Sequence, residues 1–314
     1  MPSLLACSGG GDKLSLLFGI LSYMSKNKKQ MCDWDTVAGI SAGSIVGGVV
    51  SNTTKDTLEE KMDEVEKYIM SHTVKVTTPW VYGGTVINSI DAFMFHKGFF
   101  SHVGLKKNLK QFFDDKHLKR HLLVGTYNET NPGYRTWNSN TFKDMSDAIV
   151  ASCCVPAVFE PYNIQDNEYL DGSMRHLIPV EEIKEWVRET HGPKRVDIML
   201  CYPMHDKKMF VKITSEQFGS PFLSSLTQAV SHIMLEQFEN DLKEVSVLAN
   251  VPYDVLIHGG SATYMHNNVT YNIYAPLIGV HTTFTAPSRE TSIKLFEQGK
   301  DVAKSLLNRA TLKM

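Results

Sequence analysis

The feature that most constrains the fold is a strand–turn–helix unit that occurs twice near the amino terminus. A short apolar run, Leu4–Cys7, ends at the glycine-rich turn Ser8–Gly11, and residues 13–24 then show helical spacing of apolar side chains. A second run, Thr36–Ile40, leads directly into Ala42–Val50, whose small apolar residues are typical of a buried helix. Strands that alternate with helices in this way are usually parallel and covered by the helices. We therefore expect an α/β fold of three layers, α/β/α, with a mainly parallel central sheet.

The rest of the chain continues this pattern without an obvious linker. Lys55–Ser71 is amphipathic, with apolar residues every three or four positions. Val196–Tyr202 and Tyr253–His258 are near-continuous apolar runs, as expected of strands that are buried on both faces. Pro221–Leu248 and Arg289–Leu307 have the spacing of long helices. The other expected elements are helices at Leu105–Asp115 and Phe142–Ser152 and a strand at Leu122–Tyr127. We expect one domain, in which residues 206–314 complete a core formed by residues 1–205.

Composition excludes several classes of protein. The 314 residues carry 32 Lys and Arg against 34 Asp and Glu, a formal net charge of −2, so no basic surface for nucleic acid is indicated. No apolar window reaches the roughly 18 residues of a membrane span. The amino terminus lacks the basic region of a signal peptide. Five cysteines without CxxC spacing indicate neither a disulfide framework nor a metal site. We expect a cytoplasmic protein that uses no cofactor or metal.

A candidate nucleophile lies between the second expected strand and its helix. Gly39-Ile40-Ser41-Ala42-Gly43 has the form G-x-S-x-G. At a sharp strand-to-helix turn this pattern exposes the serine hydroxyl, and the flanking glycines avoid collisions with neighbouring backbone. The amino terminus of the following helix favours negative charge that develops beside the hydroxyl. The pentapeptide predicts a nucleophilic Ser41.

The glycine turn Ser8–Gly11 allows three readings. The amides of Gly9, Gly10 and Gly11 can face a common point and stabilise an oxyanion. A Walker phosphate loop requires G-x-x-x-x-G-K-[ST], which is absent. A dinucleotide-binding loop requires G-x-G-x-x-G and an acid at the end of the second strand, whereas Asp33 and Asp35 precede that strand. We favour the oxyanion reading.

A serine nucleophile also requires a base, and two candidates follow Ser41. Asp171 ends a short apolar run and precedes Gly172 and Ser173, although Asp-Gly is also a common turn dipeptide. His258 is the best-placed histidine for a Ser-Asp-His triad. However, the serine follows only one strand–helix unit, which leaves no room for the strands that precede it in an α/β-hydrolase. A Ser41–Asp171 dyad fits this layout better.

Four motifs in this order resemble the patatin-like phospholipases. That family carries G-G-G-x-[KR]-G, G-x-S-x-G, a run similar to A-S-x-x-[IV]-P-x-x-F-x-P, and D-G-[GA]. The corresponding segments here are Gly9–Leu14, Gly39–Gly43, Ala151–Pro161 and Asp171–Ser173. The resemblance covers about residues 4–205, and the carboxy-terminal third has no motif that we recognise.

The resemblance implies the patatin-like fold and metal-independent hydrolysis of phospholipids or other acyl esters. Ser41 would be the nucleophile and Asp171 the base, with Ala42 joining the glycine amides in the oxyanion hole. Acyl transfer, thioester hydrolysis and a catalytically inactive lipid-binding protein remain alternatives. Two departures from the family pattern, Leu14 and Ser173 in place of small residues, remove no reacting group.

Two further segments have both a functional and an ordinary interpretation. The aromatic stretch Phe93–Phe100 is either an acyl channel or lid, or part of the core. Lys106, Lys107 and Lys110 on the next helix either contact lipid head groups at a membrane surface or form a solvated helix face. In both cases the ordinary interpretation is favoured.

Overall fold

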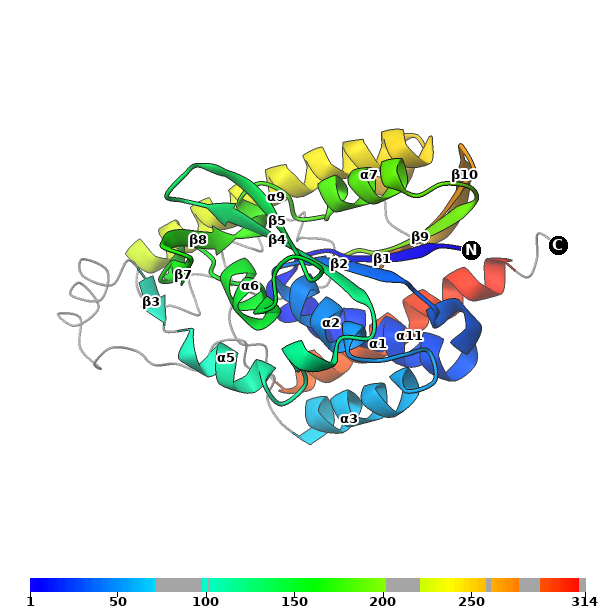
Figure 1. Cartoon of the computed structure of the whole chain (residues 1–314), viewed down its shortest axis with the longest axis horizontal. Coiled ribbons are helices and arrows are strands. Elements are labelled where there is room, and N and C mark those ends of the chain that lie inside the picture. Colours follow the sequence, from blue (N-terminus) through cyan, green and yellow to red (C-terminus); the bar gives the residue numbers. More distant parts are fainter. Residues whose placement is uncertain (72–97, 101, 202–220, 258–260, 277–288, 311–314) are drawn as a thin grey trace.

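A nine-stranded sheet runs through the centre of the computed structural model, which describes residues 1–71, 98–100, 102–201, 221–257, 261–276 and 289–310 (Figure 1). The strand order is β10-β11-β9-β1-β2-β4-β8-β7, and β5 pairs with β4 beside this path. The five strands at its centre are all parallel: β11 (Val269–Tyr274), β9 (Lys194–Met199), β1 (Ser3–Cys7), β2 (Thr36–Ile40) and β4 (His121–Asn128).

Antiparallel strands flank this parallel centre. One edge is the hairpin of β10 (Ala262–His266) with β11, and at the other side β4 pairs with β5 (Gly133–Asn138) and β8 (Asn167–Asp171). Strand β7 (Tyr162–Ile164) then pairs with β8. A separate small sheet joins β3 (Gly98–Phe100) to β6 (Ala157–Phe159).

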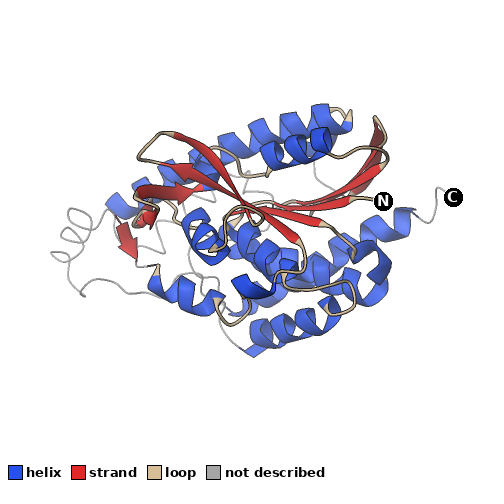
Figure 2. Ribbon diagram, in the orientation of Figure 1, coloured by secondary structure: helices blue, strands red, loops and turns tan. Residues whose placement is uncertain are grey.

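Helices cover both faces of the sheet, which confirms the expected α/β fold with three layers (Figure 2). One face carries α1 (Leu14–Asn27), α2 (Ala42–Ser51), α3 (Leu58–Ser71), α5 (Val103–Leu109), α6 (Met145–Ser152) and α11 (Arg289–Ala310). The other face carries α7 (Val180–Glu189) and α9 (Pro221–Ala249). Alternate residues of β1 explain the two cores: Leu5 and Cys7 face the first, and Leu4 and Ala6 face the second.

Helices α1 and α11 cross at two glycines although they lie at opposite ends of the chain. A Cβ atom on Gly19 would lie 1.9 Å from the carbonyl oxygen of Phe296, and one on Gly299 would lie 2.0 Å from that of Leu16. No side chain fits such gaps, so the glycines let the two backbones touch. The carboxy-terminal helix thereby packs directly on the helix that follows the first glycine turn.

The expectation of a strand at Tyr253–His258 is wrong. Residues Tyr253–Ile257 form helix α10, and His258 lies outside the described residues. Pro252 and Asp254 suit the first turn of a helix, and only Leu256 is buried, whereas a strand inside the sheet would be covered on both faces. The strand that pairs with β9 is β11 instead, and the β10–β11 hairpin turns at Asn267 and Asn268, both with positive φ.

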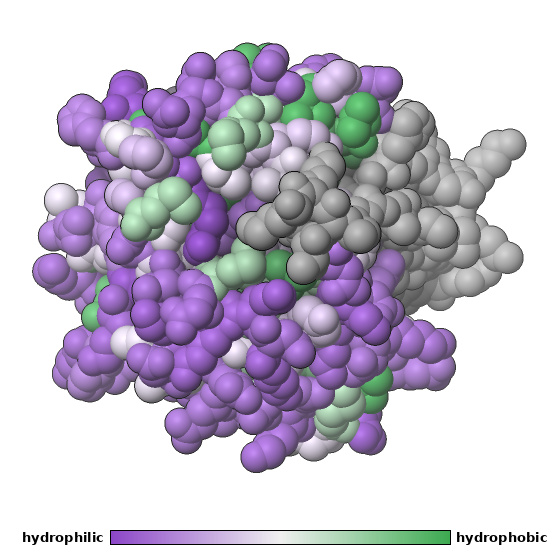
Figure 3. Space-filling view, turned by 90° about the vertical axis from the view of Figure 1, so that its right-hand side faces the viewer, coloured by the Kyte–Doolittle hydropathy of each residue, from purple (hydrophilic) through white to green (hydrophobic). Residues whose placement is uncertain are grey.

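The remaining boundaries are close to expectation, except that α5 ends at Leu109 rather than Asp115. No described helix is long and apolar enough to cross a membrane. On the face shown in Figure 3, the described surface is mostly hydrophilic with scattered apolar residues. Among described large apolar side chains, Met265 and Val247 are the most exposed, followed by Met1.

Candidate active site

Ser41 occupies a strained turn between β2 and α2. Its backbone has φ 52° and ψ −127°, a region that residues with a side chain rarely adopt. The turn is held by hydrogen bonds on both sides: the Ser41 amide donates to Oγ of Ser152 over 2.8 Å, and the Ser41 carbonyl accepts from the Ser44 amide over 2.8 Å. Strain of this kind persists only where neighbouring contacts enforce it. Here it fixes the hydroxyl at the carboxyl edge of the sheet.

The two glycines of the pentapeptide are required by close backbone packing. A Cβ atom on Gly39 would lie 2.3 Å from the Gly43 carbonyl oxygen, and one on Gly43 would lie 2.1 Å from the carbonyl oxygen of Cys7. Real Cβ atoms do not approach backbone this closely. The turn at Ser41 is therefore pressed against the end of β1, where the first glycine turn begins.

Asp171 reaches the same edge of the sheet from a neighbouring part of the chain. Strand register pairs Ile40 with Gly125 of β4, and Thr126 of β4 with Asp171 of β8. A Cβ atom on Gly172 would lie 2.4 Å from the Gly125 carbonyl oxygen and 3.0 Å from Cγ2 of Ile40. The absence of a side chain at Gly172 thus lets the Asp171 turn lie against the strand end that carries Ser41.

The Asp171 carboxylate is fully buried and only partly satisfied. One oxygen, Oδ1, accepts from the Ser173 amide over 2.8 Å, while Oδ2 has no hydrogen-bond partner among the described residues. Burial raises the pKa of Asp171 from 3.8 to about 6, and the nearby groups of Ser173 and the Ser41 side chain partly oppose this shift. A carboxylate with an open oxygen and this pKa is suited to accept a proton near neutral pH.

Ser152 ties the two turns together, a contact that the sequence analysis did not assign. Besides accepting from the Ser41 amide, its hydroxyl donates to the carbonyl oxygen of Gly125 over 2.6 Å. One buried hydroxyl thus links the Ser41 turn to the strand that borders Asp171. Its place in the Ala151–Pro161 motif was the available signal, but nothing in the sequence indicated the partners.

The glycine turn lies beside Ser41. A Cβ atom on Gly9 would lie 3.2 Å from Cβ of Ser41, and one on Gly10 would lie 2.5 Å from Cβ of Cys201. Gly11 has a φ of 56°, which favours glycine. The Gly9 amide donates to the carbonyl oxygen of Leu177 over 2.7 Å, whereas the amides of Gly10 and Gly11 have no acceptor among the described residues. Of the three expected glycine donors, Gly9 is thus engaged by Leu177, while Gly10 and Gly11 are not engaged by any described residue.

Ala42 is the first residue of α2, so its amide belongs to the unpaired first turn of that helix.

His258 and residues 93–97 of the aromatic stretch lie outside the described residues. His176, the described histidine that soon follows Asp171, has its Nδ1 2.7 Å from Asp241 and its Nε2 3.9 Å from Glu181. Its ring is thus engaged by carboxylates other than Asp171.

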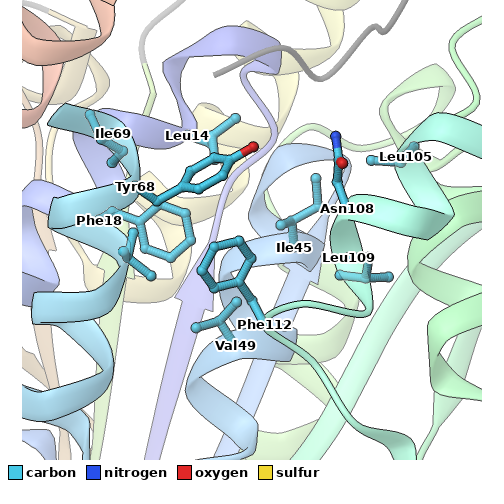
Figure 4. A pocket seen from close by; sticks show the side chains of 11 residues that line it. Leu14, Phe18, Ile45, Val49, Tyr68, Ile69, Leu105, Asn108, Leu109 and Phe112 are labelled. Carbon is cyan, nitrogen blue, oxygen red and sulfur yellow. The ribbon is translucent and has the colours of Figure 1, made fainter. Parts of the chain in front are cut away.

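An apolar cavity of about 70 Å³ lies between helices α1, α2, α3 and α5 (Figure 4). Leu14, the residue directly after the glycine turn, and Ile45, one helical turn after Ser41, are part of its wall. The rings of Tyr68 and Phe112 meet edge to face with centroids 5.2 Å apart. The other lining residues are Phe18, Val49, Val65, Ile69, Leu105, Asn108 and Leu109.

Lys106, one of the three lysines expected on helix α5, has partners that the sequence did not indicate. Its partly exposed side chain brings the ammonium group to 2.7 Å from Oδ1 of Asp147 and 2.7 Å from the Tyr162 hydroxyl, so it joins α5 to α6 and β7. These hydrogen bonds raise the pKa of Lys106. Lys107 and Lys110 are exposed.

Solved structures with some likeness to this chain include three proteins. VipD from Legionella pneumophila is 14% identical with a TM-score of 0.44, and the match covers 98% of this chain and 67% of that one. Human GIVD cytosolic phospholipase A2, in complex with methyl gamma-linolenyl fluorophosphonate and terbium chloride, is 9% identical with a TM-score of 0.43, over 97% and 57% of the chains. ExoU of Pseudomonas aeruginosa, in complex with SpcU, is 11% identical with a TM-score of 0.30, over 79% and 58% of the chains.

The chain thus spans between 57% and 67% of the length of these neighbours. No curated protein matches its sequence. The family model described as patatin-like phospholipase matches residues 5–183, more than half of the chain. The matched span contains the glycine turn, Ser41 and Asp171. The chain belongs to the patatin-like phospholipase family.

Proposed function

We propose that the protein is a serine lipid acyl hydrolase of the phospholipase A or lysophospholipase type, with Ser41 and Asp171 as its catalytic dyad. The observation that carries the proposal is the Asp171 carboxylate: it is buried, one oxygen is unpartnered, and it lies at the strand ends beside a strained serine turn. Perturbed carboxylates of this kind cluster at catalytic sites. Family membership supports lipid ester hydrolysis as the reaction class.

In the proposed reaction, Asp171 takes the proton of the Ser41 hydroxyl as Oγ attacks the ester carbonyl carbon. The amides of Gly10, Gly11 and Ala42 stabilise the resulting oxyanion. As the tetrahedral intermediate collapses, the ester C–O bond breaks, and the leaving alcohol takes the proton from Asp171. Water then gives a proton to Asp171 and attacks the acyl-enzyme. The second collapse releases the fatty acid, and the proton returns to Ser41.

The apolar cavity supports an acyl substrate because Leu14 and Ile45 connect its wall to the glycine turn and the Ser41 turn. A volume of about 70 Å³ accommodates roughly two groups of the size of a water molecule or a methylene. Part of an acyl chain therefore fits without rearrangement. We expect medium-chain esters to be preferred over acetate.

The test is hydrolysis of p-nitrophenyl esters from acetate to palmitate by the full chain. Ser41→Ala and Asp171→Asn are each expected to lower kcat by about 10³-fold or more, because each removes a reacting group. Ser292→Ala is the matched control, since this serine is also buried but its hydroxyl is unpartnered and lies on α11. A fluorophosphonate should label the unaltered protein and the control, but not Ser41→Ala.

A folded chain that neither hydrolyses any ester nor reacts with the fluorophosphonate would overturn the proposal and favour a lipid-binding role. Full activity in Asp171→Asn would remove the dyad while leaving a serine hydrolase. Acyl transfer by the same dyad would be detected as ester formation when a long-chain alcohol is added.

A further inference from the structure

One short segment of chain connects the Asp171 turn to the glycine turn. The Gly172 carbonyl oxygen accepts from the amides of Arg175 and His176, each over 3.0 Å, which folds the segment back on itself. Directly after His176, the Leu177 carbonyl oxygen accepts from the Gly9 amide over 2.7 Å. Cδ1 of Leu177 also lies 3.0 Å from the position of a Cβ atom on Gly9. The distance between the base and the oxyanion turn therefore depends on how residues 172–178 are held.

A carboxylate from the long helix α9 holds this segment. Oδ1 of Asp241 lies 2.7 Å from Nδ1 of His176, and Oδ2 accepts from the amides of Leu177 and Ile178, the latter over 2.9 Å. Asp241 is 1% exposed and His176 is 5% exposed. Three donors from consecutive residues thus converge on one buried carboxylate.

Packing alone does not explain an acid at this position. Phe238, Leu242 and Val245 form the buried stripe of α9, and Asp241 lies within that stripe. Burying a carboxylate is costly unless it is fully hydrogen-bonded, and an apolar side chain of similar size would fill the stripe without that cost. We therefore attribute the acid at this position to its hydrogen bonds with residues 176–178, and not to the stability of α9.

We propose that Asp241 is a positioning residue, which, together with His176, holds Leu177 so that its carbonyl fixes the glycine turn beside Ser41 and at a set distance from Asp171. The inference rests on the proposed function, because it assigns Asp241 a part in that reaction. It touches neither the substrate nor the reacting atoms. Its effect passes through Leu177 to Gly9, and from there to the amides of Gly10 and Gly11.

The test compares Asp241→Asn with a matched buried acid, Asp197→Asn, in the full chain. Asp197 is 0% exposed and is bound by Trp34, Arg195 and Asn272, and none of these described partners belongs to either catalytic turn. Both variants replace a buried carboxylate that accepts from several donors with an amide that has only one acceptor oxygen, so both should lower the melting temperature. Because misplacement of about 1 Å costs up to about 100-fold in rate, Asp241→Asn should lower kcat between about 10-fold and 100-fold with KM within about 2-fold. Asp197→Asn should keep kcat within about 2-fold.

A second readout does not require activity. Hydrogen–deuterium exchange of the peptide that contains Gly9 should accelerate in Asp241→Asn and remain unchanged in Asp197→Asn, because only the former weakens the support of the Gly9–Leu177 bond. Equal losses of kcat in the two variants, or unchanged Gly9 exchange in Asp241→Asn, would overturn the inference. If the unaltered protein hydrolyses no ester, the proposed function fails, and the exchange result still decides whether Asp241 holds the turn.

His176→Gln provides a variant that keeps the carboxylate. Asp241 then retains its bonds to the amides of Leu177 and Ile178 but loses the ring. We expect a smaller loss of kcat than in Asp241→Asn, in the same direction and with KM again unchanged. If Asp241→Asn does not fold, an unchanged kcat in folded His176→Gln overturns the inference.

Discussion

Replacing Asp171 by Asn should stabilise the protein at neutral pH while abolishing hydrolysis. The fully buried carboxylate has its pKa raised from 3.8 to about 6, chiefly because burial disfavours the charged form. Between about pH 4 and pH 6 the folded state therefore binds a proton that the unfolded state has released, so the free energy of unfolding falls as pH rises through this window. Above about pH 6 the native protein carries the whole cost of the buried charge.

The size of this cost follows from the shift. A rise from 3.8 to about 6 corresponds to about 3 kcal/mol. Asn keeps the shape of the side chain and an oxygen that can accept from the Ser173 amide, but it never ionises. The difference in unfolding free energy, Asp171→Asn minus unaltered protein, should thus be about 2 to 3 kcal/mol greater at about pH 7.5 than at about pH 4.

Urea unfolding of both proteins across this pH range measures the difference directly. Ser292→Ala, which changes no titratable group, should show no such pH dependence. A difference between Asp171→Asn and the unaltered protein that is constant with pH, or largest at low pH, would refute the reasoning. The same ionisation predicts that log kcat/KM of the unaltered protein falls with a slope of about one below about pH 6.

Three other changes test the packing around the site. Ser41→Gly and Ser41→Ala both lack the hydroxyl, but Gly relieves the positive φ, so its melting curve should indicate about 1 kcal/mol more stability. Gly43→Ala should destabilise by about 2 kcal/mol or more in urea unfolding, because its Cβ would meet backbone, while Gly133→Ala, whose nearest neighbour is 3.8 Å away, should stay within about 0.5 kcal/mol. Leu14→Ala should raise kcat/KM for longer esters relative to shorter ones by enlarging the apolar cavity, and an unchanged ester profile would separate that cavity from substrate.

The parts of the fold that the sequence predicts well are those encoded locally. The strand at Thr36–Ile40 and the helix after it follow from adjacent residues, and the glycines at 39 and 43 report a turn whose geometry needs them. The predicted strand at Tyr253–His258 fails because a short apolar run does not distinguish a strand from one helical turn. The packing of neighbouring elements decides between the two structures. In this segment it buries only Leu256, which suits a helix on the surface.

The candidate site shows the same division. Sequence motifs predict Ser41 and Asp171 as the candidate dyad. The residues that hold the neighbouring turns by hydrogen bonds lie elsewhere in the chain, and no motif predicts their partners. Ser152 has its partners in two other elements, and Asp241 lies on a helix outside the family match. An acid within the apolar stripe of that helix was the one available signal. Long-range hydrogen bonds of this kind become visible only once the fold brings the segments together.

The central place of β1 has a consequence for biosynthesis. One of its two neighbours, β9, and the helix α11 that packs on α1 are translated much later than β1 itself. Until they emerge, one edge of β1 is unpaired and the surface of α1 at Gly19 is uncovered. In such an intermediate the unpaired edge of β1 can pair with a wrong strand, so we expect chaperones to bind it. Because α9 also comes late, truncated products would carry the serine turn without the helix that holds Leu177 in place.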